Sequence, residues 1–191
     1  MKNAVCEYEY GYFPKAPVSS KYSIELVNEH GFGDKGIVQY ITVMFKVEKG
    51  FGTFKFVLAL PKNKTNIPVF VFPNFDKPFP ETYLPGNELI DEGFGFATFL
   101  YTDVAEDDND TFKNKLPQLL INKDRKDNDP GSIDIWSWCC MRIADYLETR
   151  KEIDINNLAI IGHSRLGKTA LLTGAFDHRF RFVFPNDSGC S

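Results

Sequence analysis

The stretch LAIIGHSRLGKTALLTG, residues 158–174, constrains the fold more than any other part of this sequence. Its first residues form an apolar run, which is typical of a strand buried on both faces of a sheet. After a short turn a helical pattern follows, with Gly167, Ala170, Leu171 and Gly174 on one narrow face. We expect this face to let the helix lie close to the sheet. A buried strand joined directly to a helix is the repeating unit of a parallel α/β sheet.

Ser164 lies in the turn between this strand and this helix, and a serine there has two interpretations. It can cap the helix, which is common. It can instead be a nucleophile on a strand-to-helix elbow, where helix amides face a developing oxyanion. Gly162 fits the usual G-x-S-x-G pattern of such elbows, whereas Leu166 replaces the second glycine. Arg165 and Lys168 oppose the helix dipole in the first turn, so we interpret both cations as functional and favour the nucleophile.

The chain before this stretch alternates strand and helix patterns. Residues 37–49 and 52–62 alternate apolar and polar positions around GFG, which predicts an antiparallel pair of strands. Continuous apolar runs at 67–75 and 94–103 predict buried strands, with a short helical segment between them. Residues 132–150 have apolar positions at helical spacing, which predicts a helix with a wide apolar face.

A last strand is expected in RFVFPNDSG, near the C-terminus. This order predicts an α/β fold, a mostly parallel sheet with helices on both faces and an antiparallel N-terminal lead-in. No repeat or linker interrupts it, so we expect residues 1–191 to form a single domain. The polar segment 103–130 is long for a loop, and such loops are often functional. Its Asp107, Asp108 and Asp110 lack the EF-hand pattern, and we interpret them as a solvated charge run, not a calcium site.

Composition and charge give no reason to expect a nucleic-acid or a membrane partner. The chain is 43% hydrophobic and 25% charged, as in ordinary globular domains, and its net charge of −4 gives no reason to expect a nucleic-acid partner. No apolar run reaches the roughly 18 residues of a membrane span, so no membrane partner is expected. The N-terminus lacks the apolar region of a signal peptide, which predicts a cytoplasmic location if Met1 is the native start. We interpret Cys6, Cys139, Cys140 and Cys190 mainly as small buried hydrophobes.

Three motifs resemble those of the glucuronoyl esterases, carbohydrate esterase family 15, in the α/β-hydrolase superfamily. GHSRLGK is similar to the family's G-C-S-R-x-G-K, GSIDIWSW to its G-A-x-x-A-W-A-W helix, and NDSG to its E-S-G. The resemblance covers roughly residues 55–191. It implies an α/β-hydrolase fold and a serine esterase that acts on carbohydrate esters through an acyl-enzyme, with no metal or organic cofactor. The partner that it implies is a small-molecule or oligosaccharide ester.

The resemblance also implies roles for individual residues. Ser164 is similar to the family's nucleophile, Arg165 to the residue that stabilises the oxyanion, and Lys168 to a residue that contacts sugar hydroxyls. Asp187 lies at the position of the family's catalytic glutamate. From the residues alone, Asp187 either orients a histidine at the sheet edge of Ser164 or is an exposed turn aspartate. His163 replaces the family's cysteine, so the motif disulfide cannot form.

The general base of such a site must be a histidine, and the sequence has three. His163 adjoins Ser164, His178 is expected about 20 Å away at the far end of the helix, and His30 precedes the predicted sheet. In the α/β-hydrolase fold the histidine follows the serine and the acid in the chain. We therefore expect an incomplete, C-terminally truncated domain with one side of its sheet exposed and apolar. Two alternatives are an acetyl esterase of decorated polysaccharides and an inactive hydrolase-fold binding module.

Overall fold

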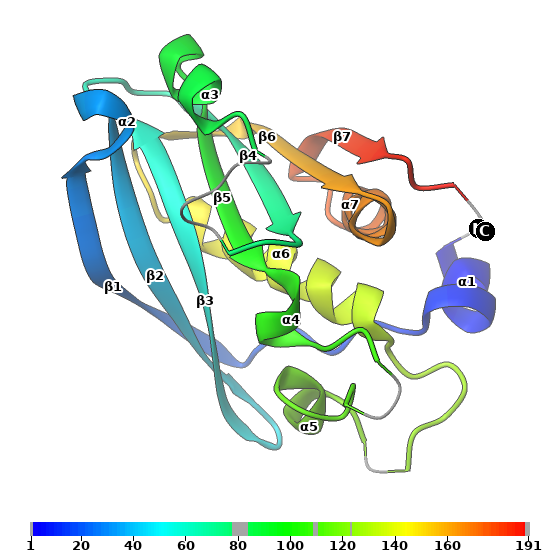
Figure 1. The fold of residues 1–191 in the computed structure, drawn as a ribbon. Helices are drawn as coiled ribbons and strands as arrows, with labels where there is room; N and C mark the ends of the chain where they lie inside the picture. The colour runs from blue at the N-terminus through cyan, green and yellow to red at the C-terminus, as the bar shows by residue number, and fades with distance from the viewer. Residues whose placement is uncertain (1, 78–83, 109–110, 123, 190–191) are drawn as a thin grey trace.

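The computed structural model describes residues 2–77, 84–108, 111–122 and 124–189. Within these residues seven strands form one sheet, in the order β1-β2-β3-β5-β4-β6-β7 (Figure 1). The strands are β1 (Ser19–His30), β2 (Gly36–Val47), β3 (Gly50–Pro61), β4 (Ile67–Asn74), β5 (Gly95–Leu100), β6 (Ile153–His163) and β7 (Phe180–Asn186). The helices are α1 (Lys2–Val5), the π-helix η1 (Cys6–Tyr10), α2 (Gly31–Asp34), α3 (Gly86–Glu92), α4 (Tyr101–Val104), α5 (Leu116–Leu120), α6 (Ser132–Leu147) and α7 (Arg165–Phe176).

The predicted α/β architecture is confirmed, with a mixed sheet. The strands β5, β4, β6 and β7 are parallel, whereas β1, β2 and β3 join them through antiparallel pairings. The edge strand β1 was not predicted, and it makes His30 the end of a strand instead of a residue before the sheet. Most of β1 is exposed on both faces, so its sequence lacks the alternation that reveals a half-buried strand.

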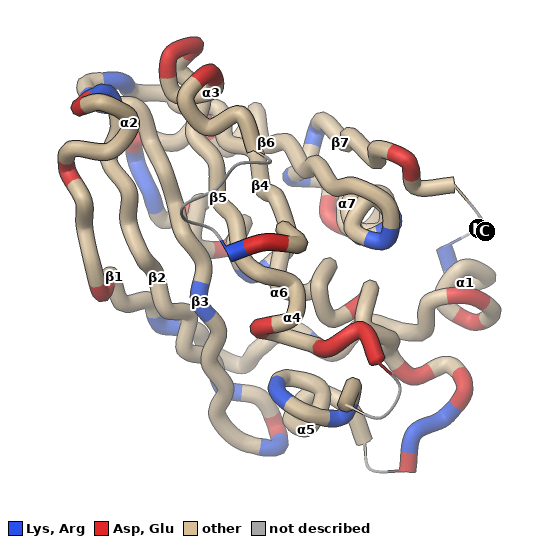
Figure 2. Tube along the Cα trace, in the orientation of Figure 1, with Lys and Arg blue, Asp and Glu red and all other residues tan. Residues whose placement is uncertain are grey.

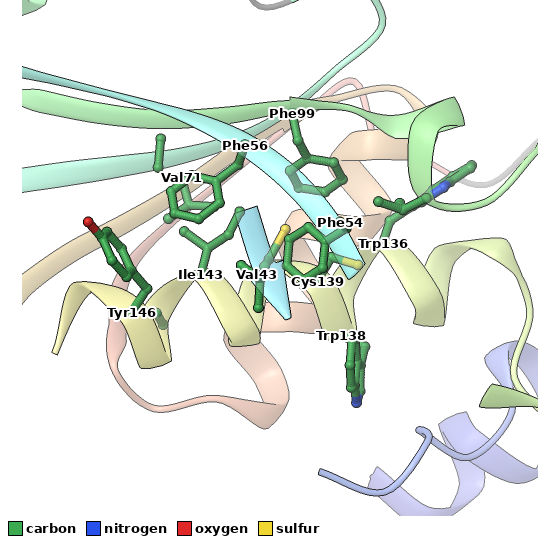
Figure 3. Close-up of a cluster of buried hydrophobic side chains, with 14 of the residues drawn as sticks. Val43, Phe54, Phe56, Val71, Phe99, Trp136, Trp138, Cys139, Ile143 and Tyr146 are labelled. Carbon is green, nitrogen blue, oxygen red and sulfur yellow. The ribbon is translucent and has the colours of Figure 1, made fainter. Parts of the chain in front are cut away.

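The helix α6 packs its wide apolar face on the sheet, as its sequence predicts. Trp136 is fully buried, and its Nε1–H donates to the Ala105 carbonyl at 3.0 Å, so this ring serves helix packing. On the other face of the sheet a second core lies beneath α3, which buries Ile90. Helices therefore cover both faces, as predicted. Figure 3 shows the larger core, in which α6 contributes Trp136, Trp138, Cys139, Ile143 and Tyr146 beside Val43, Phe54, Phe56, Val71 and Phe99 of the strands.

The helix α7 lies beside α6 on the same face of the sheet and packs closely on β7 at Gly174. One detail of the predicted face is wrong, because Leu171 is 51% exposed. The buried stripe of α7 runs through Leu166, Ala170 and Thr173, at i, i+4 and i+7, and this stripe turns Leu171 away from the core.

The opposite face of β7 matches the exposed apolar side that the sequence predicts. Phe182 is 49% exposed and Phe184 is 46% exposed, although the Phe184 ring contacts Phe70 with centroids 6.1 Å apart. Contiguous exposed aromatic surface of this kind marks an interaction site in many proteins. Nothing among the described residues covers these two rings fully.

The remaining predictions about the chain's segments have mixed outcomes. Segment 103–130 is not a plain loop, since it contains α5 and is anchored to the core by Phe112 and Ile121. Cys6, Cys139 and Cys140 are free and buried, as predicted, whereas Cys190 lies outside the described residues. No helix in the described part of the chain is long and apolar enough to cross a bilayer.

Candidate active site

The turn after β6 has the geometry expected of an elbow. β6 is parallel to both of its neighbours, β4 and β7, so its carboxyl end delivers Ser164 to the edge where parallel strands end. Ser164 has φ 54° and ψ −123°, a backbone region that residues with a Cβ rarely adopt. The helix α7 begins at the next residue, and the Lys168 N–H donates to the Ser164 carbonyl at 3.0 Å. The predicted strained turn is therefore present.

The missing second glycine of the elbow pattern has a structural explanation. A Cβ at Gly162 would overlap the Leu166 carbonyl, so a glycine is required there. A Cβ at Gly167 would lie 2.6 Å from the Asn186 carbonyl oxygen. Gly167 is therefore the second position of the elbow where the backbone passes too close to its neighbour for a side chain. The side chain of Leu166 is 1% exposed and belongs to the core. The second glycine is thus shifted by one residue, and Leu166 anchors the first turn of the helix.

The alternative in which Ser164 caps the helix is wrong. Ser164 occupies the N-cap position of α7, yet its side chain makes no capping hydrogen bond. The first amides of a helix have no intrahelical acceptor, and together with the helix dipole they favour negative charge. The arrangement therefore places a hydroxyl that does not cap the helix beside amides that can stabilise an oxyanion.

Arg165 lies beside Ser164 and is held from two sides. Its guanidinium forms an ion pair with the Asp107 carboxylate and lies over the Phe75 ring, with Cζ 5.8 Å from the ring centroid. Phe75 in turn contacts Tyr101 edge to face, with centroids 5.2 Å apart. Asp107 is exposed, as expected of a solvated charge run, but its ion pair with Arg165 was not predicted from the sequence. No local sequence signal pointed to this pair, because its members are 58 residues apart in the chain.

Asp187 lies next to the elbow, as the sequence predicts. The Ser164 N–H donates to the carbonyl of Asn186 at 2.9 Å, and Asp187 is the next residue after the end of β7. Asp187 is exposed and has φ 49°, a left-handed conformation that aspartate tolerates better than most residues. The structure therefore brings Ser164, Arg165 and Asp187 to one edge of the sheet, while the catalytic role of Asp187 stays a prediction.

Lys168 lies in the first turn of α7, one turn beyond Ser164. It is half-buried and forms no ion pair with any residue in the described ranges. Figure 2 shows the basic residues of α7 and the acidic stretch that follows α4 on the same side of the molecule. Of the two cations that oppose the dipole of α7, only Arg165 thus has a carboxylate partner within the described chain.

None of the three histidines forms a hydrogen bond with Ser164, and all three lie in described parts of the chain. The Nδ1 of His163 is 3.0 Å from the side-chain amide nitrogen of Asn186. His30 pairs with Asp34 at 2.8 Å on β1, five strands from β6, which is about 24 Å at the usual strand spacing. His178 follows the far end of the twelve-residue α7, about 20 Å from the elbow.

Metal binding has little support among the residues that the structure describes, which contain no group of three or more His, Cys, Asp or Glu that could hold an ion. In the acidic segment, Asp107 binds Arg165, and the Asp108 carboxylate accepts hydrogen bonds from the Thr111 N–H and hydroxyl at 3.1 and 3.2 Å. Asp110 lies outside the described residues. The acidic segment is therefore organised by protein contacts.

Comparison with known proteins identifies esterases as relatives of this chain, in agreement with the geometry of the elbow. Residues 43–191 match the profile of the family described as "Glucuronyl esterase, fungi". The chain is 28% identical to carbohydrate esterase MZ0003, from an unknown prokaryotic organism, over 96% of its own length and 51% of that protein. It is 32% identical to 4-O-methyl-glucuronoyl methylesterase 1 of Wolfiporia cocos, over 50% of its own length and 24% of that protein.

Solved structures agree with these matches. The glucuronoyl esterase of Solibacter usitatus superposes with a TM-score of 0.82 and 26% identity, over 97% of this chain and 56% of that one. The chain thus spans about half the length of the relatives that it matches. The family profile, the elbow at Ser164 and this superposition agree. We therefore conclude that the chain belongs to the glucuronoyl esterase family, carbohydrate esterase family 15, of the α/β-hydrolase superfamily.

Proposed function

We propose that this protein is a serine esterase that cleaves esters of a uronic acid in carbohydrates, and that Ser164 is its nucleophile. The observation that carries the proposal is the strained backbone of Ser164, φ 54° and ψ −123°, at a strand-to-helix turn where its hydroxyl caps nothing. Strain of this kind persists where the surrounding fold maintains it for function. Relatives named carbohydrate esterase and 4-O-methyl-glucuronoyl methylesterase support the substrate class.

The reaction proceeds in two steps. A histidine takes the proton of the Ser164 hydroxyl as its oxygen attacks the ester carbonyl, and the carbonyl oxygen becomes an oxyanion. The first amides of α7 and the Arg165 guanidinium stabilise that charge. Collapse expels the alcohol, which receives the proton from the histidine. A water activated by the same histidine then cleaves the acyl-enzyme and releases the uronic acid.

The other residues of the site have supporting roles in this proposal. Asp187 orients the histidine and stabilises its protonated form, as the acid of a triad does. Lys168 donates hydrogen bonds to sugar hydroxyls. Asp107 and Phe75 hold the Arg165 guanidinium, so its charge is in place before substrate arrives. Within the described residues, none of His30, His163 and His178 forms a hydrogen bond with the Ser164 hydroxyl, so this proposal assigns the base to none of them.

A fusion protein tests the substrate and the nucleophile together. Residues 1–191 are joined to the C-terminal part of the Solibacter usitatus enzyme that follows the superposed region, and hydrolysis of a methyl glucuronate is compared with that of an acetylated xylose. We expect the methyl glucuronate to react far faster and Ser164→Ala to abolish turnover. Equal turnover in the Ser164→Ala fusion would contradict the nucleophile, and faster cleavage of the acetyl ester would favour an acetyl esterase.

The unfused chain provides a second test, which asks whether residues 1–191 contain a base that activates Ser164. A fluorophosphonate probe should label Ser164 slowly in the chain alone, and added imidazole should accelerate labelling by acting as a diffusible base. Mass spectrometry locates the labelled residue, and Ser164→Ala is the control. Rapid labelling of Ser164 without imidazole would show that a base already lies within the chain.

A further inference from the structure

A pocket of about 530 Å³ lies beside the N-terminus of α6 and outside the elbow. We call it the α6 pocket. Its walls come from the end of η1, residues 107–108 and Phe112 after α4, Arg125 and the first turn of α6. Side chains with hydrogen-bonding or ring surfaces in its wall include Glu9, Tyr10, Asp107, Phe112, Arg125 and Asp134.

Asp134 gives this pocket an unusual polar group. Its side chain is fully buried, and its Oδ2 accepts a hydrogen bond from the Gly131 N–H at 2.9 Å. Its Oδ1 has no hydrogen-bond partner in the described part of the protein. A buried acceptor without a donor is costly and rare in native structures. An oxygen of this kind in a pocket wall indicates a donor that a ligand supplies.

The pocket offers acceptors and donors together. Carboxylates of Glu9, Asp107 and Asp134 accept hydrogen bonds. Arg125 donates and is fixed over the Phe112 ring, with Cζ 4.9 Å from the centroid, and the first amides of α6 lack intrahelical acceptors. A hydroxyl group both donates and accepts, so a polyhydroxylated ligand can use both sets. An ammonium group has no acceptor for Arg125, and a phosphate would face the carboxylates.

The position of the pocket links it to the elbow. Asp107 belongs to the pocket wall and also forms the ion pair with Arg165, the neighbour of Ser164. A ligand in the pocket therefore lies one side chain away from the Arg165 guanidinium. We propose that the α6 pocket binds a sugar unit of the carbohydrate that carries the ester, and that hydroxyls of this unit donate to Asp134 and Asp107. The proposal rests on the esterase function proposed above.

Binding is measured on the Ser164→Ala chain, so that the result does not depend on catalysis. Xylotriose is titrated into the ¹⁵N-labelled protein while amide chemical shifts are followed by NMR. We expect saturable shifts at residues 9–10 and 131–134, which line the pocket. Xylotriose that shifts only amides elsewhere, or none, would overturn the proposal. Tighter binding of ethylamine than of xylotriose in the same pocket would overturn it as well.

Variants assign the contacts. Asp134→Asn keeps the size of the side chain but replaces one oxygen by a donor. We expect it to weaken xylotriose binding about tenfold, as for a hydrogen bond whose loss leaves a buried polar group unsatisfied. Glu9 is exposed, so Glu9→Gln does not put folding at risk. This variant should weaken xylotriose binding by about threefold. Asp91→Asn on α3 is the matched control, because it removes a surface ion pair with Lys35 away from the pocket, and it should leave xylotriose binding unchanged. Unchanged binding in both Asp134→Asn and Glu9→Gln would refute the pocket as the sugar site.

The outcomes separate this inference from the function on which it rests. If the fusion protein cleaves uronate esters but xylotriose leaves the pocket amides unmoved, the esterase function stands and the pocket assignment fails. If xylotriose binds in the pocket but the fusion protein cleaves no ester, the pocket assignment stands as a sugar site and the esterase function fails.

Discussion

Replacing Ser164 by glycine should stabilise the protein while removing its proposed nucleophile. The Ser164 backbone, at φ 54° and ψ −123°, lies in a region that glycine adopts freely. Holding a residue with a Cβ there costs about 1–3 kcal/mol. Glycine removes this strain but also makes the unfolded chain more flexible, which lowers the free energy of unfolding by about 0.4–1 kcal/mol. We therefore expect Ser164→Gly to raise the free energy of unfolding by about 1 kcal/mol.

The assay is urea unfolding followed by tryptophan fluorescence, since Trp136 and Trp138 are 0% and 1% exposed and report loss of the core directly. For a chain of this size, about 1 kcal/mol corresponds to a melting temperature higher by about 2–4 °C. Ser164→Ala is the matched control, because it removes the same hydroxyl but keeps the Cβ and its strain. It should unfold within about 0.5 kcal/mol of the wild type, as for substitutions away from stabilising contacts.

The sign of the change relative to the wild type tests the reasoning. If the Ser164 hydroxyl capped α7, alanine would destabilise the protein by about 0.5–2 kcal/mol and glycine by a few tenths. Both variants would then have a lower free energy of unfolding than the wild type. Ser164→Gly at or below the wild-type free energy of unfolding would refute the strain at the elbow.

Three further predictions follow from the structure. Gly162→Ala should lower the free energy of unfolding by about 3 kcal/mol or prevent folding, because its Cβ would overlap the Leu166 carbonyl. Urea unfolding measures this loss. A loss no larger than that of an ordinary surface substitution, about 0.5 kcal/mol, would show that the backbone of the elbow can relax. Burial raises the pKa of Asp134 from 3.8 to about 7, against smaller lowering by the Gly131 N–H, its own N–H and the Arg125 charge, so the folded protein holds a proton that the unfolded chain releases between these values. Stability should therefore fall by about 1.4 kcal/mol per pH unit from about pH 4 to pH 7 relative to Asp134→Asn, and level off above; parallel stability curves for the two proteins would show that Asp134 ionises normally. Arg165→Ala in the active fusion protein should lower kcat by about 10²–10³-fold with little change in KM, whereas near-normal kcat would make Arg165 a structural residue.

The sequence by itself determined the elements that depend on local pattern. Continuous apolar runs predicted the buried strands β4 and β6, and helical spacing predicted α6, because a strand or helix shows its buried side through the period of its apolar residues. The elbow at Ser164 was predictable for the same reason, since strand, glycine, serine and helix are contiguous in the chain. The proximity of Asp187 followed from parallel strand order, which brings carboxyl ends to one edge.

Only the tertiary structure decided the contacts between distant segments. The ion pair of Asp107 with Arg165 joins residues 58 positions apart, and Phe75 beneath the guanidinium comes from a third segment. The strand β1 carries almost no apolar period because an edge strand has little to bury, so its place in the sheet is set by pairing with β2. The burial of Asp134, and therefore its raised pKa, depends on segments that enclose the start of α6 from elsewhere in the chain. Local patterns specify elements, whereas charges and pockets depend on which elements the fold brings together.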